Sequence, residues 1–106
     1  YAEQLATEIE LLCQSLRASS NTLFQLRKSS SSIYSNIREA NYGQSKADFV
    51  SKMHIALKET AETEYWLKLL TMSEHISEDM GKSLLKDCLE IKRILIASIN
   101  TAKENK

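Results

Sequence analysis

The sequence predicts an all-α fold, an antiparallel up-down-up-down four-helix bundle. The 106 residues contain no proline and only two glycines, so the usual helix breakers and tight-turn residues are almost missing. Apolar residues recur at three- and four-residue intervals along the chain, which is the spacing of one face of a helix. The length suits one domain with one core. We expect a single domain over residues 1–106, with helices at about 2–17, 21–41, 45–71 and 78–101.

The first predicted helix has a narrow apolar stripe and polar outer faces. This pattern is typical of an outer helix that contacts one core. The stripe consists of Leu5, Ile9, Leu12, Cys13 and Leu16.

The second predicted helix begins after a short loop, with Ser20 or Asn21 as its N-cap. Four consecutive serines, Ser29 to Ser32, look like a linker, but the apolar spacing continues in phase through them. We therefore place them inside the helix, where small side chains permit close approach of a neighbour. The helix stripe is Leu23, Leu26, Ser30, Ile33, Ile37 and Ala40. Gly43 suits a left-handed position after the helix.

The third predicted helix carries the longest pattern in the chain. Ser45 is its expected N-cap, with Asp48 favourably placed in the first turn. Its stripe has a period of 3.5 residues and consists of Phe49, Met53, Ala56, Thr60, Thr63, Leu67 and Leu70. A second apolar set, Ile55, Trp66 and Leu69, lies elsewhere around the same helix.

The fourth predicted helix begins after Ser77 and also has two apolar sets. The inner stripe is Met80, Leu84, Cys88, Ile91, Leu95, Ser98 and Ala102. Leu85, Leu89 and Ile96 form the other set. Exposed apolar side chains favour association, because burying each one is worth about 1.5 to 3 kcal/mol. We therefore expect homo-oligomerisation through Ile55, Trp66, Leu69, Leu85, Leu89 and Ile96.

Basic residues gather in the middle of the chain. From Arg17 to Lys58 there are seven Lys and Arg residues against two acidic residues, although the whole chain carries 14 of each sign. Such a local excess can attract phosphate groups. The alternative is a solvated face with salt bridges between subunits. The candidate nucleic-acid-binding residues, for RNA or DNA, are Arg27, Lys28, Arg38, Lys46 and Lys52.

The residues point away from catalysis. His54 and His75 lack the Glu three residues earlier that a di-iron bundle requires, and the sequence has no glycine-rich phosphate loop. We expect no enzyme activity, metal, cofactor or small-molecule substrate. No run of 18 apolar residues occurs, so we expect no membrane span. Cys13 and Cys88 lie on apolar stripes, which favours buried free thiols in a reducing cytoplasm.

A dense set of residues resembles a known family. These are Leu26-Arg27, Ser32-Ile33, Asn36-Ile37, Glu39-Ala40, Gln44 to Phe49, Ile55-Ala56, Lys58-Glu59, Glu62-Thr63, Tyr65 to Leu67 and Leu69-Leu70. The pattern is similar to that of the small bacterial four-helix-bundle proteins named after the 23S ribosomal RNA intervening sequence. Many members have a glycine in place of Ala40 and a more basic second helix, and this departure weakens a nucleic-acid role inferred from the family.

The resemblance implies a bundle that forms ring-like homo-oligomers, particularly pentamers. A related accessory protein of diversity-generating retroelements has a similar fold and acts as a nucleic-acid-binding pentamer, while most family members have no established activity. The sequence therefore predicts a non-enzymatic homo-oligomeric scaffold of uncharacterised role, with nucleic acid or a nucleoprotein as the candidate partner of a basic edge. The alternative is a protein-interaction module whose apolar stripe on the third and fourth helices accepts a partner helix.

Overall fold

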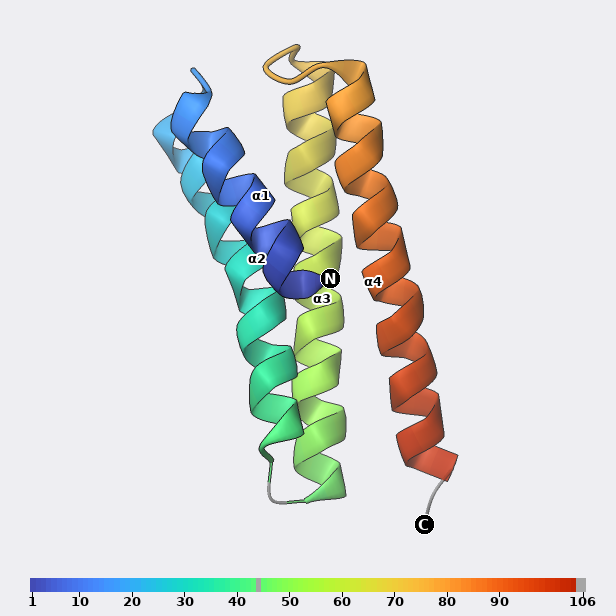
Figure 1. The fold of residues 1–106 in the computed structure, drawn as a ribbon. Helices are drawn as coiled ribbons and strands as arrows, with labels where there is room; N and C mark the ends of the chain where they lie inside the picture. Colours follow the sequence, from blue (N-terminus) through green and yellow to red (C-terminus); the bar gives the residue numbers. More distant parts are fainter. Residues whose placement is uncertain (44, 105–106) are drawn as a thin grey trace.

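The computed structural model describes residues 1–43 and 45–104, and these residues form four α-helices. Gln44 of the family-like motif and residues 105–106 of the predicted domain lie outside the described residues. The helices are α1 (Ala2–Ser15), α2 (Ser20–Asn41), α3 (Lys46–Met72) and α4 (Glu78–Glu104). Successive helices run in opposite directions (Figure 1). The predicted up-down-up-down four-helix bundle is confirmed.

Serine side chains cap three of the helices. The Asp48 backbone N–H donates to Ser45 Oγ at 3.1 Å, and the Met80 N–H donates to Ser77 Oγ at 3.1 Å. Both caps were predicted. The N-cap of α2 is Ser19, whose Oγ accepts from the Thr22 N–H, one residue before the predicted position. Any of these neighbouring serines has the right chemistry, so the sequence alone does not choose between them.

Three details of the helix ends differ from the approximate predictions. The first helix ends at Ser15, two residues early, because Leu16 turns to extended backbone with φ −87° and ψ 145°. The fourth helix continues to Glu104, beyond the predicted end near residue 101. Gly43 does not have a positive φ; among the described residues the left-handed conformation belongs to Glu74, with φ 63°, in the turn after α3.

The core follows the predicted helical stripes. The buried apolar side chains come from all four helices and include Leu5, Ile9, Leu26, Ile33, Met53, Ala56, Leu67, Leu70, Leu84, Cys88, Ile91 and Leu95. The prediction is wrong for one core residue of the fourth helix. Met80 is exposed, and Gly81 is buried in its place. A Cβ on Gly81 would lie 2.3 Å from Thr71 Oγ1. The α3 and α4 helices are therefore very close at this point.

The α3 helix has different neighbours on its two sides. On one side, Thr63 Oγ1 donates to Ser29 Oγ of α2 at 2.9 Å. On the other side, Thr71 meets Gly81 of α4. The α1 helix has 14 residues, against 27 in α3. It begins about halfway along the bundle (Figure 1), so the lower half of the bundle consists of α2, α3 and α4.

Candidate functional site

The apolar set predicted on α3 lies on the side of this helix that faces away from α4. Glu64 marks the α4 side, because its Oε1 lies 2.9 Å from Nζ of Lys92. Trp66 is two residues beyond Glu64 and therefore about 200° around the helix, and Ile55 is about 180° away. Ile55 and Leu69 are 39% and 38% exposed, while Trp66 packs partly against the core. These residues form an exposed apolar patch, the α3 patch.

The apolar set predicted on α4 lies on the side of this helix that borders α3. Leu85, Leu89 and Ile96 are seven, three and four residues from Lys92, so they share its face. Leu85 packs against the core, whereas Leu89 and Ile96 are 60% and 44% exposed. We call Leu85, Leu89 and Ile96 the α4 patch.

The two patches therefore flank opposite sides of α3. The partner-helix alternative treats the two sets as one apolar stripe, but the structure does not bring them together. A single partner helix would contact one patch at a time. The partner-helix alternative remains a prediction, and its stripe on the third and fourth helices is divided into two.

Two of the five candidate nucleic-acid-binding residues are held by acids of the same chain. Nε of Arg27 lies 2.8 Å from Oε2 of Glu10, although this nitrogen has no hydrogen-bond partner among the described residues. Nζ of Lys52 lies 3.0 Å from Oε2 of Glu39. These pairs tie α2 to α1 and to α3, so much of the positive charge of Arg27 and Lys52 is balanced within the bundle.

The other three candidates are exposed. Lys28, Arg38 and Lys46 have no ion pair among residues 1–43 and 45–104. Lys28 and Arg38 lie on α2, and Lys46 is the first residue of α3. The structure thus leaves these three predicted cations without a direct ion pair in the described residues, although the charge of Lys28 acts on the carboxylate of Glu59 in α3.

An exposed aromatic residue beside Lys28 was not among the predicted site residues. Phe24 is 58% exposed on α2, one helical turn before Lys28. The signal was present, because no Asp or Glu occurs from Leu11 to Arg38. The wider segment from Arg17 to Lys58 includes Glu39 and Asp48, so its charge balance hides this acid-free stretch.

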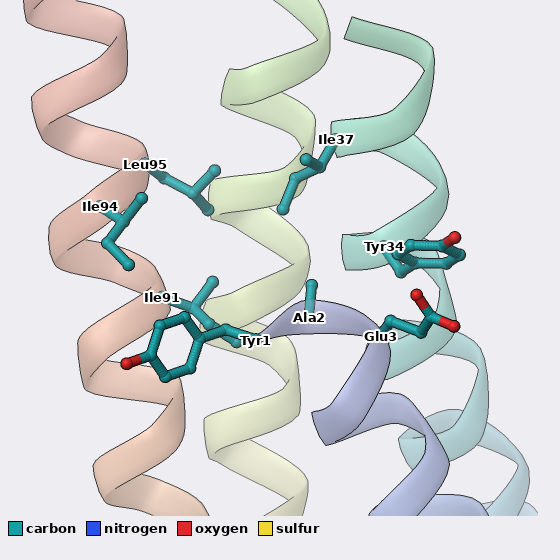
Figure 2. Close-up of a pocket in the computed structure, with 8 residues that line it drawn as sticks. All are labelled: Tyr1, Ala2, Glu3, Tyr34, Ile37, Ile91, Ile94 and Leu95. Carbon is teal, nitrogen blue, oxygen red and sulfur yellow. The ribbon is translucent and has the colours of Figure 1, made fainter. Parts of the chain in front are cut away.

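An apolar groove lies between α2 and α4 where α1 begins (Figure 2). Its volume is about 300 Å³. Ile37 of α2 and Leu95 of α4 point toward one another across it, and Tyr1 lies beside Ile91 (Figure 2). The groove exists because α1 covers only part of the bundle length. Its lining is mainly apolar and offers no arrangement of acid, base and nucleophile.

The two cysteines are free and buried, as predicted. Burial raises the pKa of the Cys88 thiol to about 12, and it also raises the pKa of Cys13. Thiolates are the reactive species, so neither sulfur is a ready nucleophile. Within the described part of the chain, no group of three or more His, Cys, Asp and Glu side chains could hold a metal ion. None of the described helices combines the length and apolarity needed to cross a bilayer.

The chain is similar to proteins of one family in both sequence and structure. The family model for the 23S rRNA-intervening sequence protein matches residues 1–97. The crystal structure of a protein of unknown function from the S23 ribosomal protein family, from Bacteroides thetaiotaomicron, is 40% identical in sequence. The match covers 93% of this chain and 91% of the other, with a TM-score of 0.87. No curated protein matches the sequence. This chain belongs to the 23S rRNA-intervening sequence protein family.

Proposed function

We propose that this protein is a non-enzymatic scaffold that assembles into a homo-oligomeric ring and presents basic residues to nucleic acid. The observation that carries the proposal is the position of the two apolar patches on opposite sides of α3. An interface between unlike patches is heterologous, and it generates a closed ring when the rotation between copies closes. A ring of five copies is the expectation that follows from the family resemblance.

The energetic reason for association is the exposed apolar surface. Leu89 and Ile96 on the α4 patch, and Ile55 and Leu69 on the α3 patch, are each more than one third exposed. Burying one such side chain is worth about 1.5 to 3 kcal/mol when it is fully removed from water. A head-to-tail contact would bury both patches of every copy, which offsets the entropy lost on association.

Light scattering after size-exclusion chromatography tests the ring. We expect a mass of about five chains for the unmodified protein. Leu89→Lys and Ile96→Lys place a charge in the α4 patch and should shift the mass towards one chain. Leu11→Lys is the matched control, because Leu11 is 62% exposed on α1, outside both patches. A single-chain mass at micromolar concentrations would overturn the ring, and an equal effect of Leu11→Lys would remove the assigned interface.

The nucleic-acid part of the proposal is supported by Lys28, Arg38 and Lys46, which are exposed and free of ion pairs among the described residues. A ring would repeat these cations around one assembly, and repetition raises avidity. Binding of labelled RNA and DNA across a salt series tests this part. Affinity should fall as salt rises, because phosphate contacts release counterions. No binding at low salt would eliminate the nucleic-acid role and leave the ring untouched.

A further inference from the structure

Five exposed residues form one continuous face along α2. Phe24, Lys28, Ser31, Ser35 and Arg38 follow one another at intervals of four, three, four and three, and all five are exposed. We call them the α2 outer face. The distance from Phe24 to Arg38 is about 21 Å at 1.5 Å per residue. This length can accommodate several nucleotides of an extended strand.

The α2 outer face combines positive charge, polar groups and an aromatic ring without an acidic residue. Lys28 and Arg38 supply the charge, and the serine hydroxyls are small enough to let a phosphate approach. The nearest acid in α2 is Glu39, which pairs with Lys52 of α3. A polyanion lying along this face would therefore meet no unbalanced carboxylate from α2 itself.

Phe24 forms one wall of an open hollow between α1 and α2. The hollow has a volume of about 560 Å³, and Arg27, Lys28 and Ser31 also line it. Glu10 lies there too, where the Arg27 guanidinium balances its charge. Phe24 and Lys28 thus line the same hollow, which places an aromatic ring and a positive charge side by side.

From this arrangement we infer that the α2 outer face binds single-stranded nucleic acid, with one base stacked on Phe24 and phosphates at Lys28 and Arg38. A single strand is preferred because of the aromatic side chain of Phe24. An unpaired and unstacked base presents a free face to this side chain, whereas duplex bases are already stacked. The inference deepens the nucleic-acid part of the proposed function and depends on that part.

Fluorescence anisotropy with labelled oligonucleotides of uniform sequence tests the inference, using single-stranded RNA, single-stranded DNA and a duplex of equal length. Single strands should bind more tightly than the duplex. Phe24→Leu keeps an apolar side chain but removes the aromatic ring. It should weaken single-strand binding by about five-fold or more, since stacking of one base is worth about 1 to 3 kcal/mol. Phe24→Tyr should restore most of the affinity.

Charge variants separate stacking from phosphate contact. Lys28→Gln and Arg38→Gln should each reduce the magnitude of the negative slope of log affinity against log salt by about 0.7, the value for one phosphate of a single strand. Lys86→Gln on α4 and Tyr1→Leu on α1 are the controls, because both remove exposed groups outside the α2 outer face. The controls should leave binding unchanged.

Three other outcomes would each reject a different part of the inference. Equal binding of duplex and single strand, with no effect of Phe24→Leu, would overturn the single-strand inference while phosphate binding by the scaffold stood. Equal losses in the control variants would overturn the assigned face. Absence of any binding at low salt would reject the inference together with nucleic-acid binding, and the mass measured by light scattering would still decide the ring separately.

Discussion

The two sides of α3 are packed by different chemistry. On the α2 and α3 helices, four small polar residues are buried among the apolar side chains of the core: Ser29, Ser30, Thr60 and Thr63 are all 1% exposed or less. Their hydroxyls mostly bond to carbonyls of their own helix, such as Ser29 Oγ to Leu26 O and Thr60 Oγ1 to Ala56 O. The bond from Thr63 to Ser29 crosses between the helices. Polar burial is tolerated here because the hydroxyls are satisfied.

Towards α4, the packing depends on shape. Gly81 allows Thr71 to approach, and Ile99 lies eighteen residues further along α4, five full turns at 3.6 residues per turn, so it faces the same side. Ile99 is 4% exposed. The contact of α3 with α2 therefore includes a hydrogen bond between buried hydroxyls, whereas its contact with α4 at Gly81 depends on close approach of the side chains. Substitutions on the two sides should therefore have different costs.

The largest expected effect is on the α4 side. Ile99→Ala removes a buried side chain and should lower the free energy of unfolding by about 2 to 5 kcal/mol, because a cavity remains. Urea denaturation followed by circular dichroism, at one fixed protein concentration, measures the change. Ile94→Ala is the matched control, since Ile94 is 40% exposed on the same helix. Equal losses for the two variants would show that burial at position 99 is not the cause.

The next effect concerns the close approach of α3 and α4. Gly81→Ala should lower the free energy of unfolding by about 1 to 2 kcal/mol, because overpacking at Thr71 outweighs the roughly 1 kcal/mol helix-propensity gain of alanine. Adding Thr71→Ala removes the two atoms that lie within 3.0 Å of the new Cβ. The double variant should recover most of the loss in thermal denaturation. A single Gly81→Ala variant more stable than the parent would contradict the tight contact.

On the α2 side the expected cost is smaller. Thr63→Val keeps the shape of the side chain and removes the hydroxyl that donates to Ser29 and to the Glu59 carbonyl, which should cost about 1 kcal/mol. Ser29 Oγ still donates to Leu26 O, so the serine donor keeps a partner. A double-mutant cycle with Ser29→Ala isolates the coupling between the two hydroxyls. A loss as large as that of Ile99→Ala would break the distinction between the two sides.

The smallest effects come from the ion pairs that link α3 to each neighbour. Glu64→Gln should cost more than Glu39→Gln, with both below about 1 kcal/mol. The reason is exposure: the Glu64 side chain is 16% exposed and the Glu39 side chain is 58% exposed. Denaturation at low and high salt should show a stronger salt dependence for the pair of Glu39 and Lys52. The reverse order would mean that burial does not set the strength of these pairs.

Much of the bundle could be predicted from the sequence because helix phase is a local property. The stripe from Met53 to Leu70 repeats with helical spacing, and the Ser45 and Ser77 caps depend on chemistry within a few residues. Met80 was misplaced because hydropathy favours it over Gly81, although a missing side chain is what the α3 contact requires. The exposed face of α2 was also predictable from the sequence. It lies opposite the buried stripe of this helix, and no acid occurs on the helix before Glu39.

The sequence by itself determined where the helices are and which residues of each face inward, since both follow from the period of the apolar residues and from nearby caps. Only the tertiary structure decided which neighbour stands on each side of a helix. It separated Trp66 from Leu89 across α3, and it balanced Arg27 and Lys52 with acids distant in the chain. The physical reason is that a helical period fixes an angle around one axis, whereas a contact also requires the position of a second axis, which packing of the whole core determines.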